Sequence, residues 1–88
     1  MNEEILMILQ ICCNKFGVTE AQIKSANTNI EVANCRKAFA KIVKGKFTIS
    51  NKTIGSYINK KSGSVTYMLN TVICDKKLER IINEITDK

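Results

Sequence analysis

The sequence of 88 residues contains no histidine and no proline, and it has only four glycines. Without histidine the chain lacks the commonest general base and the nitrogen ligand of many zinc sites. No Gly-rich phosphate loop is present, and no nucleophile stands beside a base at a recognisable spacing. We therefore expect a protein that is not an enzyme and that holds no metal ion or other cofactor.

Long apolar runs are missing as well. No stretch reaches the roughly 18 apolar residues of a membrane-spanning helix, and Met1–Glu4 lacks the basic start of a secretory signal. With 44% hydrophobic and 25% charged residues, the composition is that of an ordinary soluble protein. The sequence predicts a single domain over residues 1–88, without membrane contact, in the cytoplasm.

The four cysteines do not favour disulfides or a metal site. Cys12 and Cys13 are neighbours in a helical pattern, so their side chains point about 100° apart. Together with Cys35 and Cys74 they form no Cys-x-x-Cys pair. We expect small free thiols at or near the core.

Acidic residues are absent between Val32 and Cys74, although the whole chain carries eight of them and a net charge of +6. This acid-free stretch contains eight basic residues: Arg36, Lys37, Lys41, Lys44, Lys46, Lys52, Lys60 and Lys61. A charged surface that faces only water normally mixes both signs. Charge of one sign is typical of a surface that meets a polyanion, most simply nucleic acid phosphate. A lysine-rich composition without such a partner is the alternative.

Apolar residues recur at helical spacing along most of the chain. The expected helices, with their end signals, are residues 3–16 before Gly17, a short helix from the Thr19 cap to Lys24, 30–44 before Gly45, 51–58 after the Ser50 cap, 63–73 capped by Ser62 or Ser64, and 76–86 after Asp75. Residues 47–49 are expected to be a connector, with a short strand as the alternative. The sequence thus predicts an all-α bundle of five to six helices, with a core that includes Phe39, Ile54, Val65, Met68, Leu69 and Val72.

Helices 51–58 and 63–73 are separated by a tight turn at residues 59–61 inside the acid-free stretch. This arrangement favours a helix-turn-helix, in which the first helix crosses the DNA backbone and the second places its N-terminal residues in the major groove. The groove is about 12 Å wide and suits short side chains at the start of that helix. Any antiparallel helix pair with a Gly-containing turn gives a similar pattern, and the lack of acidic residues favours the DNA-binding interpretation.

The expected contacts to DNA fall into two groups. Phosphate contacts are expected on the long third helix and beside it, at Arg36, Lys37, Lys41, Lys44, Lys46 and Lys52. Residues near the bases are expected after the turn, at Lys60, Lys61, Ser62, Ser64 and Thr66. Tyr67 is expected either to reach a phosphate or to pack as a half-buried ring. For Arg36 the alternative is a surface ion pair with Glu31 or another neighbouring residue.

Several short motifs follow one another in a specific order: Phe16–Gly17–Val18, Ile23–Lys24–Ser25, Glu31–Val32, Arg36–Lys37, and Ser50 with Ile54–Gly55 and Ile58. In this order they resemble the C-terminal DNA-binding domain (domain IV) of the bacterial replication initiator DnaA, which belongs to the Trp-repressor-like helix-turn-helix superfamily. The resemblance extends from Ile5 to about Val72. It implies an all-helical fold with a surface that faces DNA.

In the signature of that family, G-R-D-H-T-T-V, the six residues from Arg to Val align with residues 60–65 once one loop residue is deleted. In this register Val65 is buried, whereas the ungapped register would bury Thr66. The family reads its nine-base DNA box through the Asp-His-Thr-Thr residues and through an arginine in the loop before the third helix. Here the Asp-His-Thr-Thr positions are taken by Lys61, Ser62, Gly63 and Ser64, and the corresponding loop at residues 25–29 has no arginine. The resemblance therefore implies binding to duplex DNA, but not to the nine-base box of the initiator.

Two functions follow from these patterns. The first is a stand-alone module for double-stranded DNA, of the kind that phages and mobile elements encode, which regulates or assists replication or transcription. The second is a protein-interaction module that keeps the fold but has lost the DNA-reading residues, and that docks a replication or virion protein through the apolar face of helix 76–86. The sequence leaves open whether the chain is a monomer or a homodimer formed through that helix.

Overall fold

The computed structural model describes residues 2–26, 29–70, 80 and 83–84, and within these residues it contains five α-helices and no strand. The helices are α1 (Glu3–Phe16), α2 (Glu20–Lys24), α3 (Ile30–Lys46), α4 (Asn51–Ile58) and α5 (Ser62–Asn70). The predicted all-α fold is confirmed, and residues 47–49 form a connector. The expected helix 76–86 lies mostly outside the described residues, as do residues 71–73 of the fifth helix.

Local signals set the ends of the first two helices. Gly17 closes α1 in the left-handed conformation, with φ 66°, which a residue without a Cβ adopts at little cost. Thr19 caps α2 in a capping box: its hydroxyl accepts from the backbone N–H of Gln22, and the Gln22 side chain accepts from the N–H of Thr19. Both ends agree with the prediction.

The end of α3 differs from the prediction. Gly45 does not stop the helix, which continues to Lys46. The stop comes from Phe47, whose backbone is extended and whose N–H still donates to the Val43 carbonyl at 2.9 Å. The Phe47 ring packs against the core. The chain thus leaves the helix where this partly buried ring packs against the core, and not at a glycine in the left-handed conformation.

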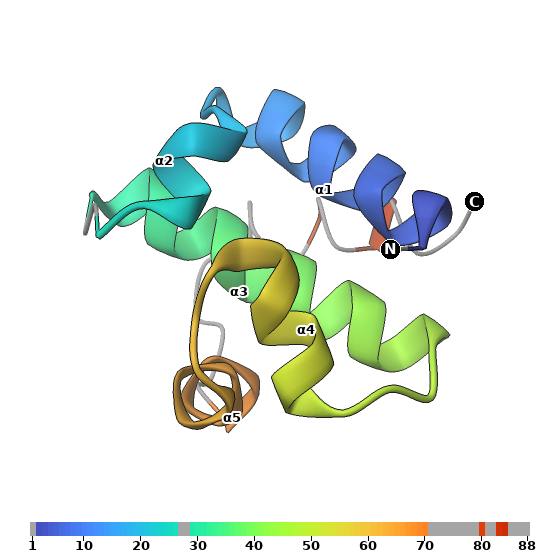
Figure 1. The fold of residues 1–88 in the computed structure, drawn as a ribbon. Helices are drawn as coiled ribbons and strands as arrows, with labels where there is room; N and C mark the ends of the chain where they lie inside the picture. The colour runs from blue at the N-terminus through green and yellow to red at the C-terminus, as the bar shows by residue number, and fades with distance from the viewer. Residues whose placement is uncertain (1, 27–28, 71–79, 81–82, 85–88) are drawn as a thin grey trace.

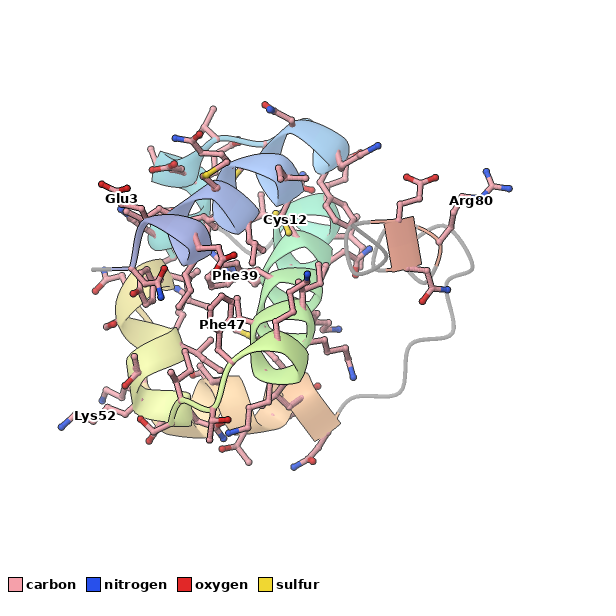
Figure 2. All side chains as sticks on the ribbon, turned by 90° about the vertical axis from the view of Figure 1, so that its right-hand side faces the viewer. Glu3, Cys12, Phe39, Phe47, Lys52 and Arg80 are labelled. Atoms are coloured by element: carbon pink, nitrogen blue, oxygen red, sulfur yellow. The ribbon has the colours of Figure 1, made fainter. Side chains whose placement is uncertain are left out.

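The long helix α3 is the centre of the fold and contacts all four other helices. Figure 1 shows α1 and α2 on one side of α3 and α5 on the other. Phe39 of α3 is fully buried in the middle of the bundle (Figure 2), where its ring meets Tyr57 of α4 edge to face at 6.4 Å between centroids. The predicted core is confirmed for the described positions: Phe39, Ile54, Val65 and Met68 are buried, and Leu69 is partly buried.

Three of the four cysteines are described, and Cys12, Cys13 and Cys35 are buried free thiols. Burial raises the pKa of the Cys12 thiol to about 12, with a smaller contribution from Cys13. These thiols therefore behave as small apolar side chains, as predicted, while Cys74 lies outside the described residues. None of the helices in the described part of the chain is long and apolar enough to cross a membrane.

Candidate nucleic-acid interface

The turn between α4 and α5 is short because one residue adopts a left-handed conformation. Asn59 has φ 55° and ψ 45°, a conformation that asparagine tolerates better than most residues with a Cβ. The N–H of Lys60 then donates to the Gly55 carbonyl at 2.9 Å. Figure 1 shows α5 nearly end-on while α4 runs across the view, so the two helices cross steeply.

Helix α5 begins at Ser62, one residue earlier than predicted. The carbonyl of Lys61 accepts the first helical hydrogen bond, from the N–H of Val65 at 3.2 Å. Because the residue at the capping position supplies that carbonyl, Lys61 stands there, and neither Ser62 nor Ser64 is the N-cap. The first turns of both α4 and α5 lack acidic residues.

Gly55 allows α5 to lie close to α4. A Cβ at this position would collide with the carbonyl oxygen of Lys60 and would lie 3.3 Å from the Val65 side chain. Val65 is fully buried and Thr66 is exposed. The expectation that Val65, and not Thr66, faces the core is therefore confirmed.

Most of the surface of α5 faces solvent, because only Val65 and Met68 are buried in it. Its exposed residues are Ser62, Gly63, Ser64, Thr66, Tyr67 and Asn70. Tyr67 is 70% exposed, so the alternative of a half-buried ring is wrong. We use the name α4–α5 face for the exposed residues that lie here and were predicted to contact DNA: Lys52, Lys61, Ser62, Ser64, Thr66 and Tyr67.

The hydroxyl of Thr66 is held in place by two neighbours. It accepts a hydrogen bond from Nδ2 of Asn51 at 2.9 Å and donates to the carbonyl of Ser62 at 2.9 Å. The first of these bonds joins the start of α4 to the middle of α5. Asn51 was not among the expected site residues, because a contact across 15 positions of the chain leaves no periodic signal in the sequence.

Arg36 has a different role from the predicted one. Its side chain is only 6% exposed, and burial lowers its pKa. The Nε group donates to the carbonyl of Ile23 at 2.9 Å, and Nη2 donates to those of Gln22 at 3.1 Å and Ser25 at 2.8 Å. Arg36 therefore binds the C-terminal end of α2. Its burial is incompatible with both a phosphate contact and a surface ion pair.

Lys60 also reaches the end of α2. Its Nζ donates to the Ser25 carbonyl at 2.7 Å, and the neighbouring Asn59 donates from Nδ2 to the Lys24 carbonyl at 3.2 Å. Burial, followed by the nearby charge of Arg36, lowers the pKa of Lys60. The side chains of Asn59 and Lys60 thus attach the turn to the end of α2. Lys60 is partly buried and has a structural role.

The lysines of α3 are spread over several surfaces. Lys41 donates from Nζ to the Leu69 carbonyl at 3.2 Å, and Lys44 donates to the Ile49 carbonyl at 3.1 Å. Lys41 therefore lies beside α5, and Lys44 lies beside the connector that precedes α4. Lys37 is partly buried, and Lys46 lines a groove along α1. The structure thus brings Lys41 and Lys44 near α4 and α5, but it places Lys46 on another surface.

The α4–α5 unit, which we define as residues 47–70, has charged side chains of one sign only. Residues 47–70 contain three lysines, Lys52, Lys60 and Lys61, and no acidic residue. The N-terminus of α5 adds the positive end of its helix dipole, and the first backbone N–H groups of a helix have no partner within it. Phosphate groups are attracted by both features. Figure 2 shows Lys52 pointing away from the bundle.

No protein-family model matches the sequence, and neither the curated proteins nor the solved structures gave a significant match. The resemblance to the DNA-binding domain of DnaA accordingly stays a prediction. The case for a nucleic-acid interface rests on the geometry and the charge of this chain alone.

Proposed function

We propose that the chain binds double-stranded DNA through the α4–α5 face, as a helix-turn-helix module that regulates or assists replication or transcription. One observation carries this proposal: the start of α5 is exposed and carries short side chains, and residues 47–70 around it contain no acidic residue. A helix start of this kind fits the major groove and attracts phosphate. The steep crossing of α4 and α5 supports the same reading.

In this proposal the residues of the face have different roles. Lys52 and Lys61 are exposed and contact phosphates. Ser62, Ser64 and Tyr67 lie against the base edges or the sugar-phosphate backbone, while Thr66 is already bonded to Asn51 and Ser62. Serine hydroxyls hydrogen-bond to several bases. We therefore expect weak sequence preference and strong dependence on salt.

The test is a fluorescence-anisotropy titration with random duplexes at several salt concentrations. Each phosphate contact contributes about 0.9 to the slope of log K against log salt. Lys61→Gln is expected to weaken binding to all duplexes and to lower the slope by about 1. Lys46→Gln removes the same charge from the groove along α1 and serves as the control, with no expected change in slope. No binding of the wild-type chain at low salt, or equal effects of the two variants, would contradict the proposal.

A protein-interaction module is the second candidate, and one observation favours it. Four of the eight basic residues in the acid-free stretch donate to backbone carbonyls: Arg36, Lys41, Lys44 and Lys60. The fold itself therefore accounts for half of these cations. Capture of a replication or virion protein that is unaffected by Lys61→Gln, together with no binding to duplex DNA, would support this second function.

A further inference from the structure

An apolar groove runs along the outer face of α1. Its volume is about 610 Å³, and its apolar lining comes from Met7, Ile8 and Ile11. Met7 is 62% exposed, which is high for a large apolar side chain beside two other apolar residues. Figure 1 places α1 and α5 on opposite sides of α3. The groove is therefore separate from the α4–α5 face, and nothing in the proposed DNA binding uses it.

Two of the three charged residues of α1, Glu4 and Lys15, are placed symmetrically about this apolar lining, and Lys46 and Glu84 also line the groove. Glu4, Ile8, Ile11 and Lys15 follow one another at spacings of four, three and four residues, and such spacings put them on one face of a helix. Glu4 precedes Ile8 by the same number of residues by which Lys15 follows Ile11. When two such helices pack antiparallel, the acidic end of each lies opposite the basic end of the other, and their apolar residues lie opposite each other.

We propose that a second copy of this chain occupies the groove, with the two α1 helices antiparallel about a twofold axis between Ile8 and Ile11. In this arrangement Glu4 of each copy faces Lys15 of the other. The exposed Met7 and the partly buried Ile11 pack in the middle, above Ile8, which is only 7% exposed. A parallel arrangement would place like charges opposite each other. The contact is isologous, as the commonest dimers are, and it removes the exposed apolar surface from water.

The other contacts of Lys15 are compatible with this dimer. Its Nζ lies 3.3 Å from the Glu84 carboxylate of the same chain, and the two side chains are 44% and 48% exposed. An ammonium group has three protons, so Lys15 can bond Glu84 and Glu4 of the second copy together. Helix α1 has 14 residues and is about 21 Å long. An interface built mainly on this helix is small, and we expect a dissociation constant in the micromolar range.

The test measures the mass of the full-length chain by light scattering over a wide concentration range, without DNA. The mass is expected to rise from 9.9 kDa towards twice that value. Glu4→Lys and Lys15→Glu are each expected to raise the dissociation constant at least tenfold, and the double variant is expected to restore the dimer. Glu31→Lys makes the same charge change in the first turn of α3 and is the control, with no expected effect.

Two results would overturn the dimer. The first is a mass of 9.9 kDa at every concentration, as expected if other residues of the same chain or another protein cover the groove. The second is a dimer that neither single charge reversal weakens. Thermal unfolding of each variant, measured in parallel, separates loss of the dimer from loss of the fold. Because no DNA is present, failure of the dimer would leave the proposed DNA binding untouched, and the reverse also holds.

Discussion

At the scale of single residues, the basic side chains have two kinds of role. Arg36 and Lys60 donate hydrogen bonds to backbone carbonyls at the end of α2, where the helix dipole is negative, whereas Lys52 and Lys61 are exposed. The sequence shows that all four are cationic, and so it predicted one positive surface. It could not separate the two roles, because the carbonyls that meet Arg36 belong to another helix and become its neighbours only when α2 and α3 pack.

Arg36→Met tests the structural role of this residue. The variant keeps much of the apolar volume but leaves the carbonyls of Gln22, Ile23 and Ser25 without the bonds of the guanidinium group. We expect the free energy of unfolding, measured by urea denaturation, to fall by about 2–3 kcal/mol. Lys37→Met makes the corresponding change at the next position and is expected to stay within about 0.5 kcal/mol of the wild type. An Arg36→Met variant with unchanged stability but reduced affinity for DNA would contradict the structural role and indicate that Arg36 contacts phosphate.

At the scale of helices, the sequence predicted best the ends that are set by neighbouring residues. The bounds of α1 and α4 agree with the prediction, because Gly17 and Ser50 act locally. The predicted end of α3 was wrong, because the observed end depends on the packing of Phe47 against distant residues. The crossing of α4 and α5 depends on Gly55, whose close contact with the turn cannot be recognised from periodicity alone.

The variants Gly55→Ala and Gly45→Ala together test whether the crossing of α4 and α5 depends on Gly55. An added methyl group at position 55 would collide with the Lys60 carbonyl, whereas a Cβ at position 45 has no atom within 4 Å. We expect Gly55→Ala to destabilise the protein by about 1–3 kcal/mol and to displace α5. Gly45→Ala is expected to stabilise it by up to about 1 kcal/mol, because alanine favours a helix. Equal stability of the two variants in thermal unfolding would show that α4 and α5 are not closely packed.

At the scale of the whole molecule, α3 separates two surfaces of different character. One is the apolar groove on α1, with charges of both signs around it. The other is the α4–α5 face, which belongs to a unit without acidic residues. The charge pattern of the sequence predicted the second surface. It gave no sign of the first, because Met7 has the same helical spacing as core residues, and its exposure follows from how α1 lies on α3.

The most direct test of DNA binding is an NMR titration of the isotope-labelled chain with a short random duplex at low salt. The account predicts that the largest shifts of backbone amides occur from Lys61 to Tyr67, with smaller ones at Asn51 and Lys52, and that the amides of α1 stay unchanged. Addition of salt is expected to reverse these shifts, since the contacts are mainly to phosphates. The largest shifts in α1, or no shift anywhere, would contradict the claim that this helix pair is a DNA-binding surface.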